Sequence, residues 1–352
     1  MYYFKNNNKP QRPQRKKYYG KKFSVTSVLS VVKNCIFITL MGLCLALPAP
    51  SLAAWNLSAD VDARYQWTDG EHSEANLHLL GASVRKTFAD EKGDRWIFFG
   101  LVEAEDNIDE IMMHELYGQY KGPLGAWNVT AGRFGLPWGL LPGFSASRLL
   151  YDMPHDRLLG MDVDSGLKVS GVVGALDYGI SVTQGYGPHH TPHDLGHGLI
   201  VGRIGFTPGD TDEFSVGVSG AWGRSRMAHD DESTDMADMD PDRDVLRALG
   251  GVDATIYLGR FLGRIELASG RVDHRSLTTA FAGLDYALLP KLDLNLAVNA
   301  AWHGSDDEEA WFVGFTGNPP WFTIRGGYQY AGESDARHTV TLQVYRLFSW
   351  SY

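Results

Sequence analysis

The sequence predicts an all-β fold, a transmembrane antiparallel β-barrel of about 16 strands. Many short segments alternate apolar and polar residues, which is typical of strands with one apolar face. An N-terminal leader indicates export from the cytoplasm. After the leader, no apolar run approaches the roughly 18 residues that a transmembrane helix needs.

The final segment, residues 338–352, alternates over most of its length. Large apolar residues occupy every second position there: Val340, Leu342, Val344, Phe348, Trp350 and Tyr352. At the edge of a soluble sheet this face would be exposed, which soluble proteins avoid. In a membrane barrel it would contact lipid, with its aromatic residues at the interface. The ending on Tyr352 resembles the C-terminal assembly signal of bacterial outer-membrane β-barrels, which implies recognition by the barrel-assembly machinery.

Residues 1–53 have the features of a secretory signal peptide. They contain nine Lys and Arg and no acid, and residues 35–47 form an apolar run too short to span a membrane. Small residues follow, so we expect cleavage near Ala53 or Ala54. Residues 54–352 then form the outer-membrane barrel.

The composition of the mature chain excludes several classes of function. Removing nine of the 32 Lys and Arg leaves 23 against 42 Asp and Glu, a net charge of −19. This acidity argues against nucleic-acid binding, which needs a basic surface. Both cysteines, Cys35 and Cys44, lie in the leader, so we expect neither disulfide nor thiolate chemistry and no cofactor.

Sixteen segments carry the strand pattern. They are residues 55–67, 75–88, 95–105, 112–120, 127–134, 166–173, 176–184, 199–206, 213–224, 252–258, 262–272, 278–288, 292–302, 310–316, 321–330 and 338–352. The even-numbered connections are short and rich in Gly and Pro, apart from a longer turn at residues 89–94. The long stretches, 135–165, 185–198 and 225–251, all fall at odd-numbered connections. This alternation is typical of barrels with short periplasmic turns and longer outer loops.

The mature chain resembles bacterial outer-membrane porins over its whole length in leader, strand number and aromatic C-terminus. The stretch Ala131-Gly-Arg-Phe-Gly-Leu-Pro-Trp-Gly139, a long loop and then Asp162-Val-Asp-Ser-Gly-Leu-Lys-Val-Ser170 resemble the corresponding region of the phosphate-selective porin family. The resemblance implies that the third outer loop, about residues 135–165, folds into the lumen. It also implies a homotrimer.

The third outer loop is too apolar to extend into water, so we expect it to pack on the inner wall. Its charged residues are then candidates for the pore constriction: Arg148, Asp152, His155, Asp156 and Arg157. Opposite charges across a constriction would select permeants by charge. The alternative is that these charges only hold the loop in place.

Alternation also assigns charged residues to the lumen. The basic residues expected there are Arg64, Arg85, Lys168, Arg203, Arg264 and Arg325. The acidic residues expected there are Asp60, Asp62, Glu103, Glu105, Glu115, Asp177, Asp253, Glu266, Asp285 and Asp293. The excess of acids predicts a weak preference for cations, although many of these charges should pair on the wall.

Two loops have compositions that suit metal ions. One outer loop holds His189, His190, His193 and His197, but their spacing matches no closed zinc motif, so we expect a solvated loop rather than a Zn²⁺ or Cu²⁺ site. Residues 230–244 are rich in Asp and Glu without the pattern of a calcium loop. A solvated acidic loop is again the expectation, with weak divalent-ion binding as the alternative.

These features predict a porin that passes small hydrophilic solutes passively, without catalysis, among outer-membrane lipid and lipopolysaccharide. One alternative keeps the fold but makes the channel selective for phosphate or other anions. A second is an outer-membrane hydrolase, which would need a His–acid pair at the rim and fewer strands. A third is a non-conducting barrel plugged by its own loops.

Overall fold

The structure of the chain is a computed structural model. It describes residues 52–70, 73–91, 93–108, 110–143, 150–151, 158–187, 198–209, 213–226, 244–303, 306–332 and 337–352. The predicted leader therefore lies almost wholly outside the described residues, and its cleavage stays a prediction. The predicted cleavage position falls in the first residues of the first strand, which begins at Leu52.

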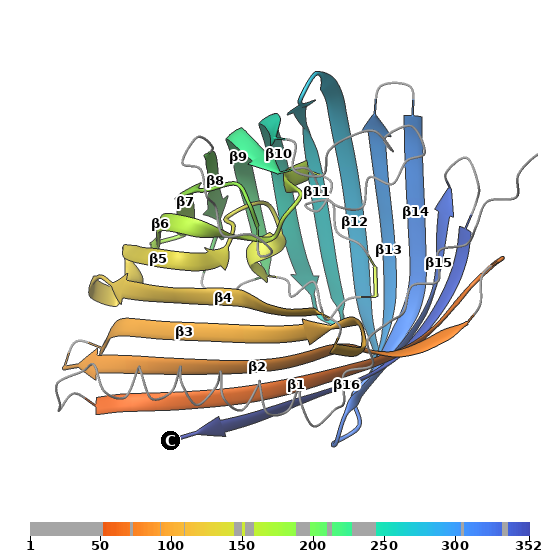
Figure 1. Cartoon of the computed structure of the whole chain (residues 1–352), viewed down its shortest axis with the longest axis horizontal. Coiled ribbons are helices and arrows are strands. Elements are labelled where there is room, and N and C mark those ends of the chain that lie inside the picture. The colour runs from red at the N-terminus through yellow and green to blue at the C-terminus, as the bar shows by residue number, and fades with distance from the viewer. Residues whose placement is uncertain are drawn as a thin grey trace, which may run out of the picture. The chain divides into compact units, whose positions relative to one another are not determined.

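Sixteen antiparallel strands form one closed barrel in which each strand pairs with its neighbours in sequence. The strands are β1 (Leu52–Thr68), β2 (Glu74–Asp90), β3 (Gly93–Glu105), β4 (Glu110–Lys121), β5 (Asn128–Gly135), β6 (Val163–Val173), β7 (Leu176–Thr183), β8 (Leu199–Phe206), β9 (Phe214–Arg226), β10 (Asp244–Leu258), β11 (Phe261–Val272), β12 (Arg275–Leu289), β13 (Leu292–His303), β14 (Asp306–Gly317), β15 (Thr323–Gly332) and β16 (Arg337–Ser351). Figure 1 shows them in order around the wall. The predicted fold class and strand number are confirmed.

Three single-turn helices are described in full: η1 (Asp106–Ile108), η2 (Pro123–Gly125) and η3 (Leu141–Gly143). Leu158 and Leu159 are also helical. In the part of the chain that the structure describes, no helix is long and apolar enough to cross a membrane.

The two faces of the wall differ in polarity, as the alternation predicts. On β11, Ile265 and Leu267 are 52% and 49% exposed, whereas Glu266 and Ala268 between and beside them are 2% and 4% exposed. The same parity holds on β8 and β9, where Ile204 and Val218 lie on the exposed face. The outer face is therefore apolar, and polar side chains gather on the inner face.

Two predicted boundaries were wrong. Residues 89–94 do not form a long turn, because Ala89 pairs with Asp94 and Asp90 with Gly93. Strand β10 begins at Asp244 rather than at residue 252. Its first part escaped prediction because Val245 and Leu249 are buried apolar residues on the inner face, which reverses the expected polarity.

The barrel closes where β1 pairs with β16 from Asn56↔Ser351 to Thr68↔Thr339. The backbones of Trp55 and Tyr352 exchange two further N–H···O bonds of 2.9 Å. Closure leaves neither of these strands with a free edge, which a membrane-spanning sheet requires.

A polar network covers the closure on the inner face. Gln343 Nε2 donates to Asp62 Oδ2 at 2.6 Å, and the guanidinium of Arg64 approaches the same oxygen at 2.9 Å. Arg325 Nη1 donates to Gln343 Oε1 at 2.7 Å. The network thus joins β15, β16 and β1, and both Asp62 and Gln343 are fully buried.

Replacing Asp62 by Ala should destabilise the barrel by about 2 kcal/mol, because Gln343 and Arg64 lose a buried charged acceptor. Equilibrium urea unfolding in lipid vesicles, followed by tryptophan fluorescence, measures the change. The control is Glu74→Ala, which removes an exposed acid from the neighbouring strand β2. Equal unfolding midpoints for the two variants would show that the network does not stabilise the closure.

Candidate functional site

The segment between β5 and β6, residues 136–162, is here called the inner loop. Its neck is closed by a 2.9 Å hydrogen bond from Leu136 N to Asp162 O, which continues the pairing of Gly135 with Val163. The structure describes residues 136–143, 150–151 and 158–162 of the loop.

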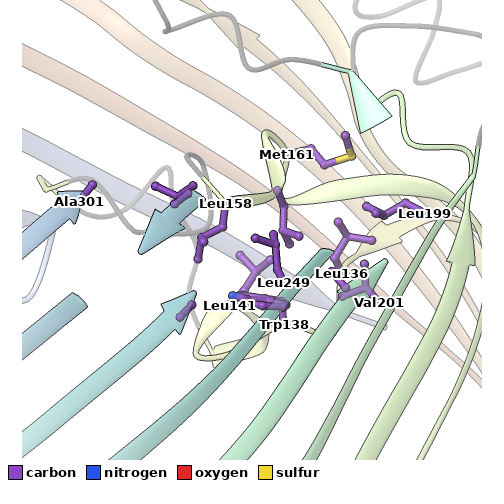
Figure 2. Packing of buried hydrophobic residues seen from close by; sticks show 13 residues of the cluster. Leu136, Trp138, Leu141, Leu158, Met161, Leu199, Val201, Leu249 and Ala301 are labelled. Atoms are coloured by element: carbon purple, nitrogen blue, oxygen red, sulfur yellow. The ribbon is translucent and has the colours of Figure 1, made fainter. Parts of the chain in front are cut away.

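Apolar side chains of the inner loop pack on the inner face of the distant wall. Leu136, Trp138, Leu141, Leu158, Leu159 and Met161 form one cluster with Leu199, Val201, Ala221, Leu249, Ala268, Leu277 and Ala301. The wall residues come from β8 to β13, and Figure 2 shows the loop side chains resting against them. Trp138 is 0% exposed at the centre of this cluster. Because the loop leaves β5 and reaches β13, it crosses the lumen.

A second, smaller cluster extends the crossing to β14. Leu140 packs with Phe281, Ala297 and Phe312, and Leu150 and Tyr151 lie against them. The Tyr151 ring is 5.9 Å from Phe281 and 5.3 Å from Phe312, centroid to centroid.

Glu266 on β11 holds the beginning of the inner loop. Its Oε1 accepts a hydrogen bond from Trp138 Nε1 at 3.0 Å, and its Oε2 accepts one from Leu140 N at 2.9 Å. Between them, Gly139 N donates to Ser219 Oγ at 2.9 Å. Only glycine fits position 139, because φ is +44° and an added Cβ would lie 2.2 Å from Glu266 Oε2.

Arg247 on β10 holds the end of the inner loop. Its guanidinium donates to the carbonyl oxygen of Leu158 and, at 2.5 Å, to Ser225 Oγ. Arg247 is 2% exposed, so these bonds satisfy a cation that the packed loop removes from water. The loop is therefore anchored at both ends to the wall of β9 to β11.

At the neck of the loop, His114 on β4 lies between two carboxylates. Its Nε2 is 3.3 Å from Asp162 Oδ2 and its Nδ1 is 3.7 Å from Glu103 Oε2. Glu115 lies at the same place, since a Cβ on Gly135 would be 3.8 Å from its Oε1. This cluster ties the end of the loop to β3 and β4.

The predicted lumen residues occupy the inner face, mostly as members of ion pairs or hydrogen bonds. Arg203 pairs with Asp177 and Asp253, each at 2.6 Å, and Arg264 pairs with Asp285 at 2.6 Å. Lys168 donates to the Gly135 carbonyl at 2.9 Å. Arg64 and Arg325 belong to the closure network, and Glu103 and Glu115 lie at the loop neck.

The sequence placed Glu266 on the inner face but did not indicate its hydrogen bonds to the inner loop. It indicated neither the role of Arg247 nor the contacts of His114. The predicted constriction residues Arg148, Asp152, His155, Asp156 and Arg157 lie outside the described residues. So do the histidines of the other loop, His189, His190, His193 and His197. Within the described ranges, no group of three or more His, Cys, Asp or Glu is arranged to hold a metal ion.

The inner loop divides the lumen unevenly. Its apolar clusters lie against β8 to β14 and its neck contacts β4, so the inner faces of β15, β16, β1 and β2 lie away from its packed side. Those faces carry Arg325, Gln343, Asp62 and Arg64. A polar wall therefore faces an apolar loop across the barrel, an arrangement suited to guiding water and small polar solutes past one side of the loop.

The sequence matches no protein-family model, and no curated protein is similar to it. Solved structures are similar in fold. The trimer form of OmpT, an outer membrane protein of Vibrio cholerae, aligns with a TM-score of 0.66 at 12% identity over 84% of this chain and 99% of that chain. An anion-selective porin from Comamonas acidovorans aligns with a TM-score of 0.65 at 10% identity over 84% and 100%.

Salmonella typhi OmpF, in complex with daunomycin, aligns with a TM-score of 0.61 at 12% identity over 84% of this chain and 97% of that chain. At such identities the similarity establishes the fold and leaves the permeant open. Together with the closed barrel and the loop inside it, these alignments show that the chain has the sixteen-stranded fold of bacterial outer-membrane porins.

Proposed function

We propose that this chain is an outer-membrane porin, a passive channel for small hydrophilic solutes and ions. The observation that carries the proposal is the inner loop, which crosses a closed barrel of sixteen strands and is fixed to one side of its wall. A barrel of this size is wide enough for an aqueous channel, and a fixed loop inside it would narrow the channel to a defined passage. The chain would catalyse no reaction.

In this proposal the barrel lowers the barrier to permeation by replacing lipid with water and polar side chains. The inner loop sets the size limit, because its apolar side chains are buried against the wall and hold it in place. Charges on the loop and on the opposite wall then bias which ions enter. The constriction residues predicted from the sequence, Arg148, Asp152, His155, Asp156 and Arg157, remain part of this proposal.

The contacts of the inner wall favour a weak cation preference. Arg203 is held by two carboxylates, so that group carries a net negative charge. A net negative charge along a lumen attracts cations. The anion-selective relative in fold makes anion preference the second candidate.

Location and assembly belong to the same proposal. The leader of residues 1–53 would direct export, and the apolar outer face with its strand ending at Tyr352 would suit insertion into the outer membrane. A homotrimer is proposed because a trimer form is among the structures that share the fold.

Single-channel recordings of the refolded protein in a planar bilayer should show discrete conductance steps. In a KCl gradient the reversal potential should have the sign of K⁺ preference, because carboxylates predominate on the inner wall. Anion preference with block by phosphate would instead support the anion-selective candidate. A folded barrel without steps would contradict the channel and favour an enzyme or a plugged barrel.

Replacing Glu266 by Ala should raise the mean conductance and add current noise. The inner loop would lose a charged acceptor of two hydrogen bonds, which weakens its anchoring by about 2–3 kcal/mol. Glu213→Ala, at an exposed acid beside β9, is the matched control. Identical conductance and noise in both variants would show that the apolar cluster alone positions the loop.

A further inference from the structure

An aromatic patch lies on the outer face of β1 to β5, near the turns that join β2 to β3 and β4 to β5. It consists of Trp55, Phe88, Trp96, Phe98, Tyr120 and Trp127. Five of these rings, all except Trp55, form a continuous series, with centroid distances of 6.0 Å for Phe88–Phe98, 6.4 Å for Trp96–Phe98, 4.9 Å for Trp96–Tyr120 and 5.5 Å for Tyr120–Trp127. Trp96 and Trp127 are 47% and 42% exposed.

Lys86 stands within this patch and breaks the outer apolar row of β2. It is directly opposite Trp55 on β1 and Phe98 on β3, so all three side chains share the outer face. The Lys86 ammonium lies 4.4 Å from the Trp55 ring centroid and 4.8 Å from that of Phe88. The residue is only 8% exposed.

The rings attract the ammonium but leave its hydrogen bonds unmade. An ammonium has three N–H donors, and aromatic faces supply electrostatic attraction rather than strong acceptors. None of the described residues provides a carboxylate, hydroxyl or carbonyl acceptor to Lys86 Nζ. A cation that is largely removed from water without an acceptor is unfavourable. The described residues therefore supply no hydrogen-bond acceptor to Lys86 Nζ. Because Lys86 lies on the outer face, we infer that its acceptor comes from outside the chain.

A second copy of the chain is poorly suited to supply that partner. On the outer rows of the described strands, acidic positions lie at three strand ends: Asp90 at the end of β2, Asp244 at the start of β10, and Asp307 and Glu309 at the start of β14. Strands β10 and β14 begin at the opposite end of the barrel from the start of β1, where Lys86 and Trp55 pair. Asp90 lies at the same end as Lys86, but its carboxylate already pairs with Arg95 at 2.7 Å. Backbone carbonyls along the paired strands already accept ladder bonds. A lipid phosphate, by contrast, is present all around the barrel at the level where aromatic residues meet the membrane interface.

We propose that Lys86 and the aromatic patch form a binding site for the phosphodiester of an anionic membrane phospholipid. The ammonium donates to phosphate oxygens, and the exposed indole rings of Trp96 and Trp127 contact the glycerol and the upper acyl chains. Charge complementarity and the apolar surroundings both favour a lipid over a free anion. The site rests on the proposed membrane location, but it is independent of channel activity.

Native mass spectrometry of the detergent-purified protein with added cardiolipin, phosphatidylglycerol or phosphatidylcholine tests the site. We expect the anionic lipids to remain bound and the neutral lipid to dissociate. Lys86→Gln should weaken anionic lipid binding about fivefold, the effect of one cation near an anionic headgroup. Lys86→Arg should retain most of the binding. The control is Lys121→Gln, since the Lys121 ammonium pairs with Asp94 at 3.8 Å and should not contribute.

Several outcomes would overturn the site. They are equal lipid binding by Lys86→Gln and the unchanged protein, displacement of the lipid by millimolar inorganic phosphate, and loss of oligomers in Lys86→Gln without loss of lipid. The last would assign the patch to a subunit interface. Conductance of Lys86→Gln in a planar bilayer should equal that of the unchanged protein. Lipid binding by a barrel that does not conduct would uphold the site while refuting the proposed porin function.

Discussion

The structure depends on the closure of β1 against β16. An open sheet would leave two edges of unpaired backbone N–H and C=O groups, which are costly wherever water does not reach them. The thirteen-residue register from Asn56↔Ser351 to Thr68↔Thr339 removes both edges. It also fixes which side chains face inward on all the remaining strands, because residues that pair directly on neighbouring strands share a face. The inner network of Asp62 and Gln343 and the outer aromatic residues thus follow from one pairing.

Period-two alternation was enough to predict the fold class, the strand number and most strand ranges. It failed where the inner wall is not polar. Val245 and Leu249 face inward because the inner loop covers them, so the first half of β10 does not have the pattern of a strand bounded by water. A prediction that assumes a wet lumen cannot detect such a segment. The two-residue connection between β2 and β3 was missed for a different reason: its charged residues suggested a longer turn, whereas Arg95 bonds to Asp90 at 2.7 Å across the hairpin.

The amino-acid composition predicted which segments form the candidate site, but not which side chains contact one another there. The apolar content of the inner loop indicated that it packs on the wall, and parity placed Glu266 inward. Nothing local indicated that Trp138 and Glu266, 128 residues apart, would bond. That contact depends on how far the loop travels across the barrel, which is set by the combined packing of Leu136, Trp138 and Leu141. The same holds for His114, whose contact with Asp162 requires the loop to return to the wall of β4.

The departures from alternation also show what each face of the wall contacts. An apolar residue on the inner face, such as Leu249, needs apolar side chains to pack against, and the inner loop supplies them. A charged residue on the outer face needs a polar partner. Arg346 finds one within the chain, since its guanidinium donates to the carbonyl oxygens of Pro320 and Trp321 at the turn between β14 and β15. Lys86 has rings but no acceptor. The same rule that explains Leu249 and Arg346 therefore calls for a polar partner for Lys86, and the proposed lipid phosphate would supply it.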